Sequence, residues 1–125
     1  MIYLDTHVIV WLYAGLTEKL SQKAIELIED NDICISPIVK LELCYLQEIE
    51  RIKPSAQEII SHLQSQIGLS ICDTPFEDIV NKALSYNWTR DPFDRLITAN
   101  ATCTHMRLLT KDEIIRKHIK LAVWD

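Results

Sequence analysis

Ile2-Tyr3-Leu4-Asp5-Thr6, at the start of this 125-residue chain, is the stretch that decides the fold. Its three apolar residues predict a short buried strand, and the apolar run at 8–12 predicts a helix that follows almost at once. Thr6 is a candidate cap for that helix, because its hydroxyl can accept a hydrogen bond from an unpaired backbone N–H. A strand followed directly by a helix is the unit of α/β proteins.

The same alternation continues to the end of the chain. Further strands are predicted at 33–36, 69–72, 108–109 and 121–123, and helices at 21–29, 37–49, 55–67, 75–84, 92–100 and 112–118. This order predicts an α/β protein with three layers, α/β/α, around a mostly parallel sheet of four or five strands. At this length, with no repeat or low-complexity tract, residues 1–125 are expected to form a single domain.

Composition excludes several classes of protein. No apolar stretch approaches the roughly 20 residues that cross a bilayer, and the N-terminus reaches Asp5 without a basic leader, so a cytoplasmic protein without membrane contact is expected. The four cysteines lack the CxxC spacing of zinc or thioredoxin-type sites. A net charge of -5 is unusual for a nucleic-acid binder. Residues 95–125, however, carry six basic and three acidic side chains, which form either a local basic margin or an ordinary solvated face.

Five acidic residues lie where predicted strands end or predicted helices begin: Asp5, Glu42, Asp91, Asp94 and Asp112. In parallel α/β sheets, ligands bind beyond the carboxyl ends of the strands. Carboxylates gathered there repel one another unless a hard cation lies among them, and Mg²⁺ and Mn²⁺ prefer oxygen ligands. The five acids therefore predict a divalent-metal site.

Each of these acids also has an ordinary explanation when taken alone. Asp5, Asp91 and Asp112 suit turns or helix caps, and Asp94 suits the positive end of a helix dipole. Glu42 is harder to explain in this way, because its apolar neighbours predict a largely buried helix and buried glutamates are rare unless paired.

Four motifs in order carry a resemblance to a known family. They are Leu4-Asp5-Thr6-His7 before an apolar helix with Trp11-Leu12, Ile35-Ser36-Pro37 before Leu41-Glu42-Leu43, the diagnostic run Arg90-Asp91-Pro92-Phe93-Asp94-Arg95, and Leu108-Leu109-Thr110-Lys111-Asp112. The chain resembles PIN-domain nucleases, and especially the VapC-type toxins of bacterial toxin–antitoxin systems. It departs from the pattern at Leu41, where a Trp often stands, and at Thr89, where a His often stands. Both positions concern packing or the substrate rim.

The resemblance implies a role for individual residues. Asp5, Glu42, Asp94 and Asp112 match the acidic quartet that holds Mg²⁺ or Mn²⁺, and Asp91 is an additional acid whose part in metal binding stays open. Thr6 and Thr110 match hydroxyl residues that can hydrogen-bond the carboxylates. Arg90, Arg95 and Lys111 are candidates for contacts to RNA phosphates, with plain surface charge as the alternative. Arg95 can equally pair with Asp91 one turn back.

The implied function is that of a divalent-metal-dependent endoribonuclease, the toxin of a type II toxin–antitoxin pair. RNA phosphodiester bonds would be hydrolysed by water activated by one or two metal ions, with no Ser, Cys or His nucleophile. A cognate antitoxin and a homodimer are the expected partners. The apolar helices at 8–12 and 41–49 suit an antitoxin groove, the core or a dimer face.

Two other functions remain alternatives. One is a catalytically silent PIN-like module that only binds RNA or protein. The other is a receiver-type phosphoacceptor domain, in which Asp73 would be the acceptor. The receiver lacks support after the first strand, where Thr6 and His7 stand in place of adjacent acids. His7 also excludes a haloacid-dehalogenase-type phosphatase, which needs an acid two positions after the first Asp.

Overall fold

A five-stranded sheet lies at the centre of the computed structural model, which describes residues 1–125. The strands are β1 (Ile2–Leu4), β2 (Ile33–Ile35), β3 (Ser70–Ile71), β4 (Arg107–Leu109) and β5 (Ala122–Val123). They lie in the order β3-β2-β1-β4-β5, and every neighbouring pair is parallel. The predicted α/β/α architecture is confirmed, with five strands.

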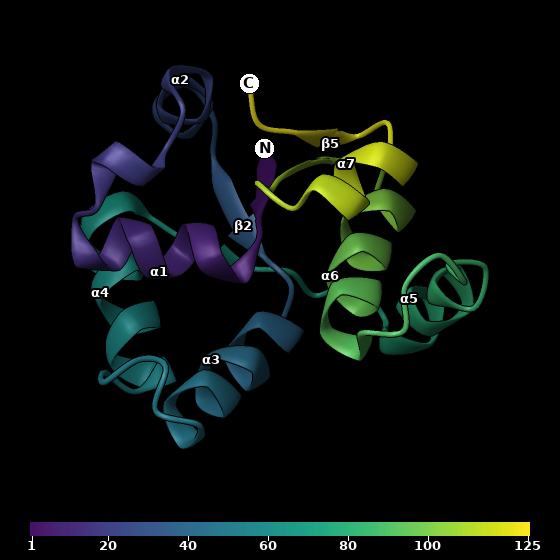
Figure 1. The fold of residues 1–125 in the computed structure, drawn as a ribbon, viewed down its shortest axis with the longest axis horizontal. Coiled ribbons are helices and arrows are strands. Elements are labelled where there is room, and N and C mark those ends of the chain that lie inside the picture. Colours follow the sequence, from purple (N-terminus) through teal and green to yellow (C-terminus); the bar gives the residue numbers. More distant parts are fainter.

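Seven α-helices cover the sheet. They are α1 (Thr6–Ala14), α2 (Gln22–Asp30), α3 (Ile38–Glu48), α4 (Ala56–Ile67), α5 (Phe76–Ala83), α6 (Pro92–Cys103) and α7 (Glu113–His118), with one 3-10 turn at Thr17–Lys19. Figure 1 shows α1, α2 and α4 on one side of the sheet and α5, α6 and α7 on the other. Helix α3 packs against both α4 and α6 and so joins the two sides at one end of the molecule. None of these helices is long and apolar enough to cross a membrane.

The core explains why these segments became strands. Strands covered on both faces need continuous apolar runs, and Ile2, Leu4, Ile35, Leu108 and Leu109 have no exposed surface. Helix ends follow the local signals in the sequence. Ser55 caps α4 through its side chain, and Gly68 ends it in the left-handed conformation that glycine adopts without strain.

The start of α1 differs from the prediction. Asp5, and not Thr6, is the N-cap: its backbone is extended and its side chain accepts a hydrogen bond from the backbone N–H of Thr6. Thr6 is already the first helical residue, so its hydroxyl is free to turn toward another partner.

The strand order reverses beside β1. The chain moves outward from β1 to β2 and β3, then crosses back to β4 and β5 on the other side. Open α/β sheets bind ligands at such a switch point, beyond the carboxyl ends of the strands. Residues that directly follow β1 and β4 must therefore lie beside one another at this position.

Candidate active site

A pocket of about 360 Å³ contains all five acids that the sequence singled out. Its nine lining residues are Asp5, His7, Val8, Trp11, Glu42, Asp91, Asp94, Lys111 and Asp112. The carboxylates come from the ends of β1 and β4, from α3, and from the start of α6, which are far apart in the sequence. The fold thus brings the predicted cluster together at the switch point of the sheet.

Asp5 is held by two separate hydrogen bonds. One carboxylate oxygen, Oδ1, accepts from the backbone N–H of Thr6 at 2.8 Å, and Oδ2 accepts from the hydroxyl of Thr110. The same Thr110 hydroxyl accepts from the backbone N–H of Asp112 at 3.1 Å. Because Thr110 is completely buried, it fixes Asp5 and the start of the Asp112 segment relative to each other.

Glu42 is held in a matching way from α3. Its side chain accepts a hydrogen bond from the hydroxyl of Thr6, which is also completely buried. Glu42 itself is 9% exposed, so the expectation of a buried glutamate on this helix is confirmed. Two threonines, one after each central strand, therefore each orient one carboxylate of the pocket.

Asp91 and Asp112 cap the helices α6 and α7. Asp91 Oδ1 accepts from the backbone N–H groups of Phe93 and Asp94, and Asp112 Oδ1 accepts from that of Ile115 at 2.9 Å. The second oxygen of each carboxylate has no hydrogen bond to the protein, although both residues line the pocket. Asp94, in the first turn of α6, uses neither oxygen in a cap.

Burial and mutual repulsion change the acidity of three of these groups. Burial, together with the negative charges of Asp5, Asp91, Asp112 and Glu42, raises the pKa of Asp94 from 3.8 to about 8. Burial also raises the pKa of Asp5, even though Thr110 and the N–H of Thr6 favour its charged form. The pKa of Glu42 is raised, first by burial and then by its acidic neighbours, against the hydrogen bond from Thr6. The carboxylates are close enough to oppose one another's ionisation.

The donor set fits a hard divalent cation. All five acids offer carboxylate oxygens as ligands. None of them forms a salt bridge, since the salt bridge in the structure joins Arg116 to Asp125. The five acids line one pocket, but no three of the His, Cys, Asp or Glu side chains already surround a common point as metal ligands would. Oxygen ligands and uncompensated negative charge are the conditions that Mg²⁺ and Mn²⁺ meet in proteins.

The three predicted cationic residues lie in different places. Lys111 lines the pocket, while Arg90 is exposed and does not. Arg95 donates from Nε to the carbonyl oxygen of Ala83 at 2.9 Å and from a terminal nitrogen to that of Leu84. The alternative pairing of Arg95 with Asp91 is not formed, because the guanidinium instead donates to carbonyl oxygens at the end of α5.

Three lining residues, His7, Val8 and Trp11, were not assigned to the site from the sequence. His7 and Trp11 were named as parts of the first motif without a role in the site, yet both lie in the pocket. Their spacing of four residues places them on one side of α1, which is the signal that could have identified them together. Asp73, the residue that a receiver domain would phosphorylate, lines a different cavity with Tyr3 and Cys72.

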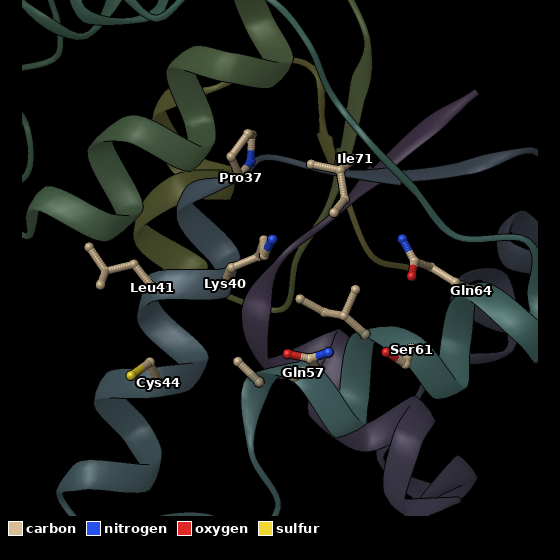
Figure 2. A pocket seen from close by; sticks show the side chains of 10 residues that line it. Pro37, Lys40, Leu41, Cys44, Gln57, Ser61, Gln64 and Ile71 are labelled. Carbon is tan, nitrogen blue, oxygen red and sulfur yellow. The ribbon is translucent and has the colours of Figure 1, made fainter.

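A larger cavity, of about 640 Å³, lies between α3 and α4 (Figure 2). Lys40, Leu41 and Cys44 of α3 and Gln57, Ser61 and Gln64 of α4 are among its lining residues, and Lys40 extends toward α4; no acidic residue lines it. The expectation that α3 is largely buried holds for Leu43 and Leu46 but is wrong for Leu41, which is 57% exposed, and for Ile49. Val8 and Ile9 of α1, by contrast, belong to the core.

Comparison with known proteins agrees with this fold. The PIN domain model matches residues 2–121. Ribonuclease VapC22 of Mycobacterium tuberculosis is 33% identical over 124 residues, covering 94% of this chain and 91% of that protein. Two solved structures have a similar fold, each with a TM-score of 0.68: VapBC2 from Rickettsia felis bound to a promoter DNA fragment, and a toxin–antitoxin complex from Klebsiella pneumoniae. The first is 23% identical and covers both chains fully; the second is 19% identical and covers 98% and 96%.

A five-stranded parallel α/β/α fold with a carboxylate-lined pocket at its switch point defines the class, and this chain belongs to the PIN-domain family. Within that family, its relation to Ribonuclease VapC22 confirms the resemblance to VapC-type proteins that the four sequence motifs predicted.

Proposed function

We propose that this protein is a divalent-metal-dependent endoribonuclease and the toxin of a type II toxin–antitoxin pair. The observation that carries the proposal is the convergence of five carboxylates, three of them with raised pKa, in a pocket whose charge no salt bridge neutralises. The relation to a VapC ribonuclease supports RNA as the substrate. An RNA substrate would support an activity in the cytoplasm.

Asp5, Glu42, Asp94 and Asp112 are the residues that would hold the metal, with Asp91 as an additional acid at the rim. When bound, Mg²⁺ or Mn²⁺ lowers the pKa of a coordinated water and neutralises charge that develops on the phosphate. Thr110 and Thr6 keep Asp5 and Glu42 in position by hydrogen bonds. Glu42, nearest to the hydroxyl of Thr6, either binds metal or orients the attacking water.

Water is the proposed nucleophile because the pocket offers no hydroxyl or thiol for covalent catalysis and its carboxylates are the proposed metal ligands. No Ser, Thr or Cys lines it, and its one histidine, His7, has no hydrogen bond to a neighbouring acid. Lys111, at the edge of the pocket, is suited to contact the RNA phosphate. Arg90 lies on the exposed segment before α6 and is a second candidate, whereas Arg95 is occupied by the carbonyls of α5.

An antitoxin is the proposed protein partner. The cavity between α3 and α4 has the exposed apolar side chain of Leu41 at its edge and the ammonium of Lys40 in its wall, which suit a segment carrying an apolar and an acidic residue. The two similar solved structures are toxin–antitoxin complexes, which supports such a partner. A homodimer stays a prediction, for which exposed Phe76 and Leu84 on α5 offer an apolar face.

The test is cleavage of a mixed RNA pool by purified, antitoxin-free protein in Mg²⁺, Mn²⁺ or EDTA. We expect cleavage with either metal and none in EDTA. Asp94→Asn should reduce it by about 10²–10³-fold, the typical size of one lost electrostatic contact to a transition state. Asp73→Asn is the matched control, because Asp73 is an exposed acid outside the pocket, and it should cut normally.

The competing function is a silent PIN-like module that binds RNA or protein without turnover. A folded, metal-loaded wild type that binds the RNA pool but leaves it intact would favour this module. Cleavage that survives in EDTA, or equally in Asp94→Asn, would contradict a role for the acidic pocket.

A further inference from the structure

Trp11 supplies the accessible apolar surface of the acidic pocket. Of the two hydrophobic residues among its nine lining residues, Val8 is completely buried in the core, whereas Trp11 is only partly buried. The remaining lining residues are five acids, His7 and Lys111. Trp11 packs against the core on one side, and its remaining surface lines the charged pocket.

The indole ring is held in place from two sides. Its centroid lies 6.0 Å from that of Trp124, which is 5% exposed, in an edge-on arrangement. On the same side of α1, the His7 ring lies 6.1 Å away and is tilted by 48°. Trp11 follows Asp5 by six positions, which corresponds to about 9 Å along the helix axis. The ring is therefore held at a defined position in the same pocket as the carboxylates.

Two lysines lie next to the same ring. The ammonium groups of Lys111 and Lys19 are each 5.9 Å from its centroid, within the range of a cation–π contact. Lys111 also lines the pocket and lies in sequence between Thr110 and Asp112. An aromatic ring with ammonium groups beside it is the combination by which proteins hold single-stranded nucleic acid, since bases stack on the ring while phosphates meet the cations.

We propose that Trp11 is a positioning residue on which one unpaired base of the RNA stacks, next to the phosphate that is cut, while Lys111 contacts the backbone between them. This inference rests on the proposed nuclease function and adds the part of the substrate that the pocket recognises besides phosphate. A base inside a duplex cannot present its face to a side chain, so the substrate must be unpaired at this nucleotide.

The test is a double-mutant cycle that combines removal of the Trp11 ring with removal of one RNA base. The RNA is a single-stranded oligonucleotide containing a cut site mapped from the cleaved pool, and an abasic nucleotide replaces each base flanking the cut in turn. For wild type we expect one abasic position to reduce kcat/KM by roughly 5- to 150-fold, the range of one base–aromatic stack. Trp11→Leu should lose a similar factor on intact RNA, and the abasic nucleotide should then cost little more.

Matched variants separate stacking from folding. Trp88 is partly buried and stacks on His118 at 5.1 Å, outside the pocket, so Trp88→Leu should cut like wild type and remain sensitive to the abasic nucleotide. Trp11→Phe retains a smaller ring and should show an intermediate loss with the same base sensitivity. Thermal melting of each variant checks the packing on Trp124.

The outcomes are distinct from those that test the nuclease itself. If the losses from Trp11→Leu and from the abasic nucleotide multiply when the two are combined, the base does not stack on Trp11. Normal cleavage by Trp11→Leu would contradict the stacking proposal as well. Either result would favour a protein partner as the molecule that contacts the ring. If wild type cuts no RNA, the proposed nuclease function fails, and stacking of a base on Trp11 is then tested by RNA binding. Kd for a fluorescein-labelled random 12-nucleotide RNA should then rise in Trp11→Leu and not in Trp88→Leu. An unchanged Kd in Trp11→Leu would contradict base stacking on Trp11.

Discussion

Helices α1, α6 and α7 begin at an aspartate, whereas α2 and α4 begin at a serine. Four of the five caps accept the backbone N–H three residues on: Ser21 and Ser55 at 3.0 and 3.1 Å, and Asp91 and Asp112 at 3.1 and 2.9 Å. Asp5 accepts the N–H of the next residue, Thr6, at 2.8 Å. Serine and aspartate stabilise a helix start about equally, so capping alone does not select the acid. The aspartates Asp5, Asp91 and Asp112 all line the pocket, and neither serine does.

The difference shows how one residue serves two purposes. In Asp91 and Asp112 one oxygen satisfies the helix, and the other has no protein partner and is available to a ligand. A capping carboxylate is also immobilised by its own helix, so its position does not have to be set when a metal binds. At the serine-capped helices nothing beyond the cap is required.

Exchanging the two kinds of cap is the strongest way to test this comparison. Asp112→Ser keeps a capping oxygen for Ile115 and removes a carboxylate, so we expect RNA cleavage to fall by about 10²–10³-fold with little change in the free energy of unfolding. The reciprocal change, Ser55→Asp, should leave both cleavage and stability close to wild type. Cleavage with mapped RNA and urea unfolding are the measurements. Normal cleavage by Asp112→Ser would mean that Asp112 is only a cap.

Thr110 offers a smaller test, because it supports a carboxylate without belonging to the ligand set. Its hydroxyl donates to Asp5 and accepts from the N–H of Asp112. Thr110→Val removes both contacts at nearly constant shape, and we expect cleavage to fall by about 10–100-fold, as for other residues that orient metal ligands. Thr110→Ser keeps the hydroxyl and should restore most of the activity. A similar loss in both variants would assign the effect to packing, and raising Mg²⁺ should rescue Thr110→Val in part.

Much of this arrangement could be predicted from the sequence because its signals are local. Pro92 at the first helical turn, Ser55 as a cap and Gly68 as a stop each fix a helix end within a few residues, and the structure places those ends accordingly. The acids could be grouped because parallel strands bring their carboxyl ends to one edge. What local signals could not give was which neighbour each polar group meets. Arg95 has both Asp91 and the end of α5 within reach, and only the packing of α5 on α6 decides.

The same limit applies to α3 and to Trp11. Apolar residues at Leu41 and Ile49 predict burial by type, but the helix lies at the end of the sheet with only part of its surface covered, which leaves both exposed. Trp11 is apolar and helical and so reads as core, whereas the structure leaves part of the ring in the pocket. In both cases the exposure of the side chain depends on where the whole helix lies in the fold, and the sequence pattern within the helix does not predict that position.

Asp94 contrasts with the capping aspartates, because its charge lies in the pocket and its carboxylate accepts no backbone hydrogen bond as a cap. Burial and the neighbouring carboxylates raise its pKa in the folded protein from the ordinary 3.8 to about 8. Between these two pH values the folded state binds more protons than the unfolded state, so the free energy of unfolding falls as pH rises from about 4 to 8. Asp94→Asn removes this contribution. At pH 8 in EDTA the variant should therefore be more stable than wild type by on the order of 1–2 kcal/mol, after allowance for solvent screening.

Urea unfolding at pH 5 and pH 8, with EDTA or with Mg²⁺, measures this effect. The advantage of Asp94→Asn should shrink at pH 5, where wild-type Asp94 is protonated, and should reverse in Mg²⁺, which binds wild type more tightly and stabilises it by mass action. Asp73→Asn, outside the pocket, should follow wild type at both pH values. If wild type and Asp94→Asn show the same dependence on pH, the repulsion among the carboxylates is relieved without a metal, and the pocket would then lack the uncompensated charge that draws a divalent ion to it.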